Sequence, residues 1–306
     1  MKVGLVDVDG HNFPNLALMR LSAYHKKKGH EVEWWLGDLW HYNAVYMSKV
    51  FSNSYTKEPF DPVNVDKLIK GGTGYCITLE GGREVFNSDL NTELAPEIED
   101  MRPDYSIYPQ YDFAVSMTSR GCPRGCAFCH VGKKEGLKSV KVADVDRFYT
   151  GQKVIEVLDP NILACRDRLD LLSQYADTGA WINYNQGLDI RLMCDEVADI
   201  LNRTKLKDVH FAWDDPNTDL TSKFKTYAEA SRKVHNSHGT VYVLTNYNST
   251  IEADLYRIYT LRDLGFDPYV MVYDKPHADR EHKQLQRWCN NIRVFKTVKR
   301  FEDYLK

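Results

Sequence analysis

The chain has 306 residues, of which 43% are hydrophobic and 27% are charged, and its formal net charge is −3. This composition is typical of a globular protein with a hydrophobic core, and the small net charge gives no electrostatic argument for nucleic acid as a main partner. The N-terminal residues lack the apolar stretch and cleavage site of a signal peptide, and no segment approaches the ~20 apolar residues that span a bilayer. We therefore expect a cytoplasmic protein that makes no contact with a membrane.

The first eighty residues are expected to form a small parallel α/β domain. Runs typical of strands occur at 2–8, 31–36, 44–51 and 66–69, and apolar residues recur at helical spacing between 15 and 28. Gly29 follows this helix at the position where glycine commonly ends one. A strand, a helix and a strand in succession favour a Rossmann-like parallel sheet in residues 1–80. Residues 81–112 are rich in Pro, Asp and Tyr, so we expect an irregular connector there.

The remaining residues, 113–306, repeat a strand–helix pattern. Strand-like runs begin at residues 113, 153, 180, 208, 240 and 267, and helix-capable stretches lie at 164–176, 194–202, 220–234 and 251–264. This spacing suits successive βα units. A full eight-unit barrel usually takes about 250 residues, so this shorter segment favours a partial (β/α)6 TIM-type barrel. The tail from Arg293 is expected to add one more strand and a terminal helix.

Three of the seven cysteines lie within eight residues. Cys122, Cys126 and Cys129 have the spacing C-x3-C-x2-C and directly follow the strand that begins at residue 113. The other four cysteines are scattered, and an odd number in a cytosolic chain argues against a disulfide framework. Parallel barrels build their active sites at the C-terminal ends of their strands. The three cysteines are therefore candidate ligands of a metal centre in an active site.

Four interpretations of this cluster compete. Zinc could be held by the three cysteines and His130, but structural zinc usually draws its ligands from two separated pairs. Covalent haem would match C-x-x-C-H from Cys126 to His130, but it needs export and leaves Cys122 unexplained. The cysteines could also be structural and bind nothing. An iron–sulfur cluster with three thiolate ligands would leave one iron open to a small molecule, and we favour this interpretation.

The spacing, with the aromatic Phe128 before the last cysteine, resembles the radical S-adenosylmethionine (SAM) superfamily over roughly residues 113–280. The resemblance implies that Cys122, Cys126 and Cys129 hold three irons of a [4Fe-4S] cluster and that the fourth iron binds the amino and carboxylate groups of SAM. Reductive cleavage of SAM would then give a 5′-deoxyadenosyl radical. The resemblance predicts a radical SAM enzyme of unknown substrate, with radical methylation or rearrangement as candidate reactions.

Polar residues after the predicted barrel strands are candidates for binding SAM. The fork of the Arg191 guanidinium suits the methionyl carboxylate, and Phe128 is expected near the adenine. Aspartate and asparagine are also favoured in turns whatever their function. The Gly-Gly-Glu pattern of the family is absent, and residues 158–161 resemble instead a variant of cobalamin-associated members. The predicted SAM-binding residues are Phe128, Asp159, Gln186, Arg191 and Asp214, and no catalytic residue can be assigned.

The N-terminal region also resembles a cobalamin-binding domain. Asp9 and His11 begin a segment similar to its D-x-H-x-x-G signature, with proline at residue 14 in place of the last glycine. Ser48 stands where the S-x-L element would begin, and Gly71 and Gly72 where its two glycines would be. The resemblance implies that His11 coordinates cobalt and that Asp9 supports it. Cobalamin is therefore a candidate cofactor, although radical SAM proteins also keep degenerate forms of this domain without it.

Two other classes of protein stay open. One is an iron–sulfur electron-transfer or sensor protein without SAM chemistry, and the other is a zinc-stabilised binding module. Neither needs an array of six βα units, so the enzyme is favoured. Its expected partners are an unknown small-molecule or peptide substrate and an electron donor such as flavodoxin or ferredoxin.

Overall fold

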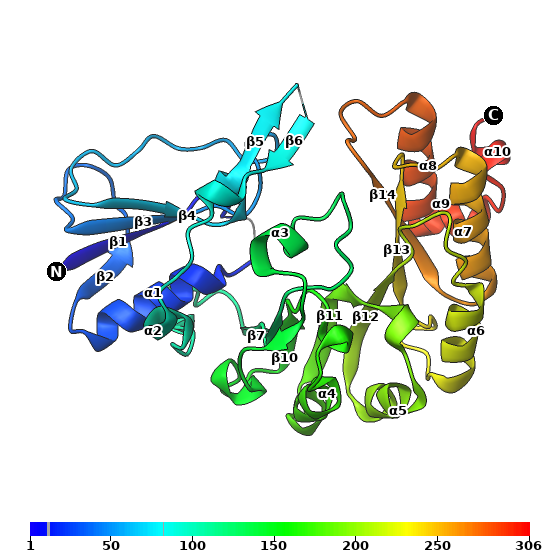
Figure 1. Cartoon of the computed structure of the whole chain (residues 1–306), viewed down its shortest axis with the longest axis horizontal. Coiled ribbons are helices and arrows are strands. Elements are labelled where there is room, and N and C mark those ends of the chain that lie inside the picture. The colour runs from blue at the N-terminus through cyan, green and yellow to red at the C-terminus, as the bar shows by residue number, and fades with distance from the viewer. Residues whose placement is uncertain (11–12, 82) are drawn as a thin grey trace. The chain divides into compact units, whose positions relative to one another are not determined.

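The computed structural model describes residues 1–10, 13–81 and 83–306 (Figure 1). The chain forms two compact units. The first comprises Met1–Val115, Arg124–Gly136 and Asp146–Thr150, and the second comprises Ser116–Pro123, Leu137–Val145 and Gly151–Lys306. The domain boundaries inferred from the sequence, after residues 80 and 112, stay a prediction. Within the described ranges, no helix is both long enough and apolar enough to cross a bilayer.

The first unit is built on a parallel sheet. Its strands are β1 (Lys2–Asp7), β2 (Glu31–Trp34), β3 (Ala44–Ser48) and β4 (Leu68–Gly71), in the order β2-β1-β3-β4. All three neighbouring pairs are parallel, with Val3 opposite both Val32 and Ala44. The predicted parallel sheet of this region is therefore confirmed. The third strand ends at Ser48, before the end of the expected run at 44–51.

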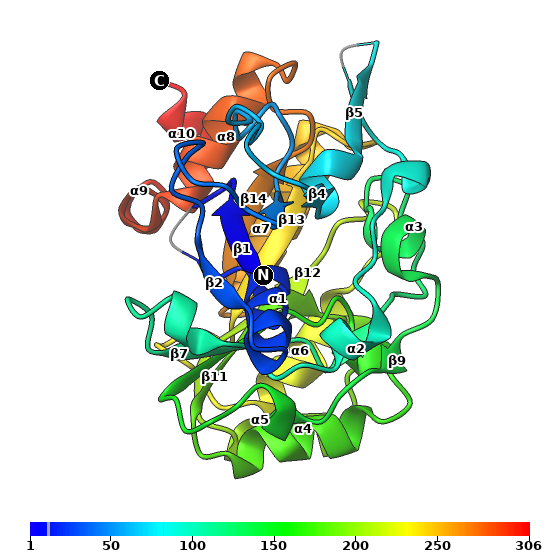
Figure 2. The ribbon, with the colours of Figure 1, turned by 90° about the vertical axis from the view of Figure 1, so that its left-hand side faces the viewer.

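Helix α1 (Leu16–Lys27) covers one face of this sheet (Figures 1 and 2). The helix begins where the sequence predicts because the Asn15 side chain accepts a hydrogen bond from the Leu18 backbone N–H at 3.1 Å. It ends at Lys27, shortly before Gly29, whose φ of 75° is the left-handed conformation that glycine adopts without strain. Leu18 packs against Leu5 in the core between helix and sheet.

The rest of the first unit consists of short elements. Strands β5 (Ile77–Glu80) and β6 (Arg83–Phe86) form an antiparallel hairpin, followed by α2 (Pro96–Glu99), and α3 (Val131–Glu135) follows the cysteine segment. The hairpin extends into the segment expected to be irregular. Ile77 pairs with Phe86 and Thr78 with Val85, and such β-branched and aromatic residues favour paired strands. Three 3-10 helices lie at Thr73–Cys76, Ser88–Leu90 and Tyr105–Ile107.

A second parallel sheet contains six strands in the described residues, in the order β14-β13-β12-β11-β10-β7 (Figure 1). The strands β10 to β14 pair in chain order and in parallel. The prediction of an α/β chain with parallel sheets is confirmed. The bounds are β7 (Phe113–Ser116), β10 (Val154–Val157), β11 (Trp181–Leu188), β12 (Leu206–Ala212), β13 (Thr240–Thr245) and β14 (Asp267–Val272). Two short strands, β8 (Ser119–Arg120) and β9 (Val140–Lys141), pair antiparallel beside it.

Helices follow the strands of this sheet and lie along its outer side (Figure 1). They are α4 (Arg168–Asp177), α5 (Asp195–Arg203), α6 (Thr221–Ala230), α7 (Ile251–Asp263) and α8 (Arg280–Asn290). Phe211 of β12 contacts Phe224 and Tyr227 of α6, with ring centroids 6.1 and 4.9 Å apart. Because side chains alternate along a strand, His210 points to the opposite, inner face. Further 3-10 helices lie at Val145–Arg147, Ile162–Ala164 and Ile190–Leu192.

The C-terminal tail is helical, so the strand expected from Arg293 is wrong. The tail consists of α9 (Ile292–Thr297) and α10 (Phe301–Tyr304). The Asn291 side chain accepts hydrogen bonds from the backbone N–H groups of Arg293 and Val294, which starts a helix. The ring of Phe295 packs against Trp288 of α8 at 4.8 Å. This cap and the apolar contact favour the helix over a strand.

Candidate functional site

The three clustered cysteines lie on the segment between β8 and α3. Gly121 and Gly125 both have positive φ, 84° and 57°, which turns the backbone sharply on each side of Cys122. None of the three cysteines forms a disulfide bond, and all three are partly exposed. Cys122 belongs to the second unit, whereas Cys126 and Cys129 belong to the first, where the Cys129 N–H donates to the Cys126 carbonyl at 3.0 Å. The half-buried Phe128 lies within this turn, as its sequence position requires.

The start of the cysteine segment is anchored by Asp159. This carboxylate is 4% exposed and accepts hydrogen bonds from the Thr118 N–H at 3.0 Å and from the hydroxyls of Thr118 and Ser119 at 2.7 Å each. The Ser119 N–H also donates to it, and Tyr175 O–H lies 3.5 Å away. Burial raises the pKa of Asp159, and the hydrogen bonds from Ser119 and Thr118 oppose that rise. Asp159 thus ties the end of β10 to the residues that precede Cys122.

Asn161 connects Cys122 to the next strand end. Its side-chain amide lies 3.4 Å from the Cys122 sulfur and 3.4 Å from an oxygen of Asp189, and the residue is 4% exposed. Asp189 in turn accepts a hydrogen bond from Arg191 Nε at 2.7 Å. The Arg191 side chain is 38% exposed, so part of its guanidinium is open to a ligand. The carboxyl ends of β10 and β11 therefore place a cysteine sulfur and a guanidinium in one hydrogen-bonded network.

Two further predicted SAM-binding residues lie at other strand ends. Gln186 is exposed on β11, where the pairing with β12 is irregular between Tyr184 and Leu188. Asp214 follows β12, and burial raises its pKa to about 6, while the charge of Arg257 opposes that rise. The two residues lie at the carboxyl ends of neighbouring strands, as predicted.

Arg257 is a structural residue of this region that the sequence did not reveal. Its side chain is 1% exposed and donates to the carbonyls of Trp213 at 2.6 Å, Asp214 at 3.1 Å and Leu244 at 2.9 Å. Its charge is balanced by the buried carboxylate of Asp254. One guanidinium thereby fixes the carboxyl ends of β12 and β13. Its position on an ordinary-looking helix gives no signal of this role.

A polar network centred on Glu156 lies on the inner face of the second sheet, and its contacts between strands could not be read from the sequence. The Glu156 carboxylate is 6% exposed and accepts from the side chains of Asn183 and Asn185 at 2.7 Å each and of Lys207 at 2.8 Å. These residues come from β10, β11 and β12. Within the described residues, the buried Asn183 Oδ1 has no hydrogen-bond partner. Alternating polar residues in the strands were the signal that could have located this network.

The residues that resemble the cobalamin signature have partners within the first unit. Asp9 accepts hydrogen bonds from the N–H groups of Val50 and Phe51, the latter at 3.3 Å. Ser48 Oγ accepts from the Asn15 amide at 2.8 Å. His11 lies outside the described residues, so the predicted cobalt ligand stays a prediction.

The two glycines of that signature lie at the end of β4. Gly71 ends β4 and pairs with Ser48, while Gly72 follows with a φ of 101°. A Cβ atom on Gly72 would overlap the backbone carbonyl of Lys49. The close approach of two chain segments is therefore enough to require glycine at residue 72.

His130, the fourth ligand in the zinc alternative, packs against an aromatic ring. It stacks on Phe86 at 5.4 Å, and burial lowers its pKa. Nearby, Lys134 donates to Thr73 at 2.7 Å, which fixes α3 within the first unit. In the described part of the chain, no three or more His, Cys, Asp or Glu side chains are grouped as ligands of one ion. The zinc site and the iron–sulfur cluster both stay predictions.

Comparison with known proteins finds similarity at the level of structure. No protein-family model matches the chain, and no curated protein matches it. Solved structures that are similar include two of the radical S-adenosylmethionine methyltransferase TsrM from Kitasatospora setae. One, with cobalamin and a [4Fe-4S] cluster bound, has a TM-score of 0.65 at 12% identity and covers 89% of this chain and 74% of that chain. The other, with tryptophan substrate and the SAM analogue aza-SAM bound, has a TM-score of 0.60 at 12% identity and covers 89% and 72%.

The chain has the fold of these two structures. At this identity the similarity concerns the course of the backbone, and the role of each side chain has to come from the chain itself.

Proposed function

We propose that this protein is a radical SAM enzyme in which Cys122, Cys126 and Cys129 hold a [4Fe-4S] cluster. One observation carries the proposal. The C-x3-C-x2-C segment follows the first strand of a parallel six-stranded sheet, in a chain with the fold of TsrM. We also propose that this sheet and its helices form a partial (β/α)6 barrel of the TIM type. Active sites of such barrels lie at the carboxyl ends of the strands, where the cysteine segment begins.

The donor set fits such a cluster. Three partly exposed cysteines on one short segment, none of them in a disulfide bond, can bind three separate irons, and a fourth iron would then keep an open position for SAM. When bound and reduced, the cluster supplies the electron that cleaves SAM. The surrounding residues position this centre. Asp159 fixes the backbone before Cys122, and the Asn161 amide donates toward the Cys122 sulfur, which tunes the potential of a cluster bound there.

For SAM itself we propose a division of labour among the predicted residues. Arg191 offers an open edge of its guanidinium to a carboxylate, and Asp214, Gln186 and Phe128 are placed to contact the rest of the molecule. We assign Asp159 to the cysteine segment instead, because its carboxylate is buried and already accepts several hydrogen bonds from the protein.

Cobalamin is the second cofactor we propose to test. One TsrM structure has cobalamin bound, and Asp9, Ser48, Gly71 and Gly72 follow β1, β3 and β4 in the order of the cobalamin signature. Their contacts within the unit also account for Asp9, Ser48 and Gly72 without a ligand. A bound corrinoid would favour radical methylation or rearrangement as the reaction. Analysis of the purified protein for cobalt and corrinoid decides whether these residues bind cobalamin or serve only the internal contacts of the unit.

The alternative is an iron–sulfur electron-transfer or sensor protein without SAM chemistry. It would share the cysteines but would have no use for the partly exposed guanidinium of Arg191, which is linked to Cys122 through Asp189 and Asn161. For the enzyme, the proposed partners are a small-molecule or peptide substrate and an electron donor such as flavodoxin or ferredoxin.

The test is anaerobic reconstitution with iron and sulfide, followed by incubation with dithionite and SAM. We expect a brown protein that releases 5′-deoxyadenosine or, if it transfers methyl groups, S-adenosylhomocysteine. C126A should lose both iron and SAM cleavage, whereas C194A, which removes a partly exposed cysteine outside the cluster, should keep both. A colourless protein that binds zinc would contradict the proposal. A brown protein that never consumes SAM would favour the electron-transfer or sensor protein.

A further inference from the structure

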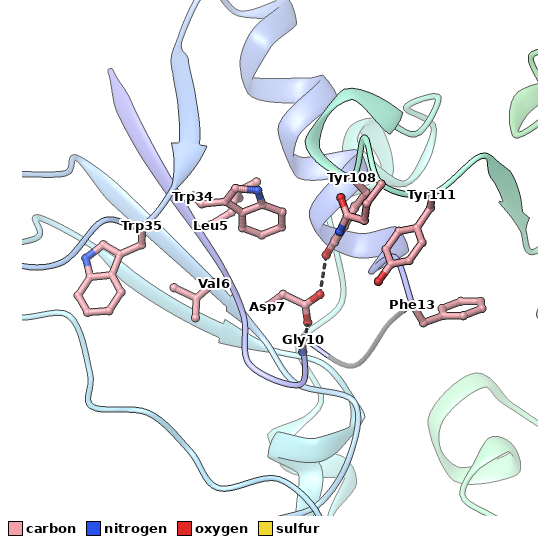
Figure 3. A pocket seen from close by; sticks show the side chains of 10 residues that line it. Leu5, Val6, Asp7, Gly10, Phe13, Trp34, Trp35, Tyr108 and Tyr111 are labelled. Atoms are coloured by element: carbon pink, nitrogen blue, oxygen red, sulfur yellow. Dashed lines mark hydrogen bonds between the residues drawn. The ribbon is translucent and has the colours of Figure 1, made fainter.

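The first unit contains a cavity of about 300 Å³ at the carboxyl ends of β1 and β2 (Figure 3). Open parallel α/β sheets bind ligands outside the carboxyl ends of their strands, and this cavity lies at that edge, beside the switch point between β1 and β3. Its volume is at the small end of the range for ligand pockets, so it suits a small molecule. The lining residues are Leu5, Val6, Asp7, Gly10, Phe13, Trp34, Trp35, Tyr108, Gln110 and Tyr111.

Aromatic rings dominate the walls. Trp34 meets Tyr108 edge to face at 5.2 Å, and Tyr108 meets Tyr111 at 6.1 Å. Figure 3 shows the rings of Trp34, Tyr108 and Tyr111 side by side, with Phe13 beyond them. Because these rings pack against one another, they form a rigid wall whose π faces and edges are already in place before a ligand arrives.

Asp7 places one negative charge among these rings. It is half-buried at the end of β1 and accepts hydrogen bonds from Tyr108 O–H at 2.6 Å and from the Gly10 N–H at 3.3 Å. Burial, together with the Asp7 hydrogen bond, raises the pKa of Tyr108, so this hydroxyl stays a donor to the carboxylate. Among the described residues, Asp7 has no Lys, Arg or His side chain as an ion-pair partner.

A half-buried carboxylate inside an aromatic wall, with no ion-pair partner among the described residues, suits a cation of a particular kind. A metal ion would need several oxygen ligands, whereas this cavity offers one carboxylate and otherwise mainly carbon. An ammonium group satisfies both features, since the carboxylate balances its charge and the rings attract its methyl or methylene groups through cation–π interactions. We propose that this cavity binds a small organic ammonium ion.

The cavity borders one part of the cobalamin-like signature, because Gly10 and Phe13 lie within the segment that begins at Asp9. Ser48, Gly71 and Gly72 lie at the ends of β3 and β4, on the other side of β1 from β2 in the sheet. The inference rests on Asp7, Trp34, Tyr108 and Tyr111, none of which the proposed function assigns to a cofactor, so its failure would leave that function untouched.

The experiment compares two ligands by isothermal titration calorimetry on the full chain. The probes are choline and the neutral alcohol in which the quaternary nitrogen of choline is replaced by carbon. Both have the same shape, so only the charge differs. We expect choline to bind the wild-type protein at least about tenfold more tightly than the neutral alcohol.

Variants then locate the site. D7N keeps an acceptor for Tyr108 and removes the charge, so it should lower the affinity for choline to that for the neutral alcohol. E31Q is the matched control, because it removes an exposed charge at the other end of β2, and it should bind choline as the wild type does. Y111L should lower the affinity for choline several-fold, because it removes one of the aromatic rings.

Three results would overturn the proposal. The first is equal affinity of the wild-type protein for choline and the neutral alcohol, and the second is no saturable binding of choline. The third is unchanged choline binding by D7N when its circular dichroism spectrum matches that of the wild type. The ligand comparison on the wild-type protein stays decisive even if a variant fails to fold.

Discussion

Replacing Asp159 should loosen the start of the cysteine segment. In D159N, the amide oxygen can keep the Ser119 contacts, but its NH2 group then faces the Thr118 N–H, which is left without an acceptor in a buried site. A buried unsatisfied donor costs about 1–3 kcal/mol, and the remaining hydrogen bonds lose their charge assistance. We therefore expect D159N to lower the free energy of unfolding by about 2–3 kcal/mol. D159A removes every acceptor and should cost about 4 kcal/mol.

The assay has two readouts. Thermal unfolding should show a Tm lowered by about 2–4 °C for each kcal/mol, a scale that holds for domains of 150–250 residues. The iron content per chain after anaerobic reconstitution should be highest in the wild type, lower in D159N and lowest in D159A, because the backbone before Cys122 is no longer fixed. D170N is the matched control. It removes an exposed carboxylate of α4 that pairs with Lys141, and surface pairs contribute about 0–1 kcal/mol. If D159A kept the wild-type Tm and iron content, Asp159 would not anchor the segment.

Three other predictions concern the frame around the site. G72A should lower the free energy of unfolding of the first unit by about 3 kcal/mol or more, measured by thermal unfolding, because its Cβ would overlap backbone. G29A, with open space around it, should lower the free energy of unfolding by only about 1 kcal/mol. Equal losses in the two variants would refute the close approach at residue 72. R257M should lower the free energy of unfolding in urea by about 3–5 kcal/mol, because it leaves the buried Asp254 carboxylate with only His282 at 3.6 Å as a cationic neighbour. A loss below about 1 kcal/mol would contradict this. Burial raises the pKa of Asp214 from 3.8 to about 6, so the folded state holds this proton more tightly than the unfolded state. The resulting stability, at most about 3 kcal/mol, is fully present below about pH 4 and lost as the pH rises through about 6. Urea midpoints of D214N should lack this pH dependence, and an unchanged profile would refute the shift.

The sequence predicted what depends on local pattern. Strands and helices in succession, with Asn15 and Gly29 at the ends of the first helix, were enough to predict parallel sheets. The spacing of the cysteines located the candidate centre after β7. The C-terminal strand was wrong because the cap at Asn291 and the contact of Phe295 with Trp288 favour helix, and the second of these is a tertiary contact.

The roles of individual polar residues were less predictable, because they depend on partners far away in the sequence. Asp159 looked like a ligand-binding residue after a strand, but its partner Thr118 lies 41 residues earlier. Arg257 lies on a helix and looks exposed in sequence, yet its donors meet carbonyls of residues such as Leu244 at two strand ends. Asp7 was not singled out at all, since its importance comes from rings such as Tyr108 that lie about a hundred residues away.

The central claim is that the three cysteines hold a [4Fe-4S] cluster with one iron open to SAM. Electron paramagnetic resonance of the reconstituted, dithionite-reduced protein tests it most directly, with and without SAM. We expect about four irons per chain and a reduced-cluster signal that changes when SAM is added, because SAM binds the iron that no cysteine occupies. C126A should show no such signal. A cluster signal identical with and without SAM would contradict the claim.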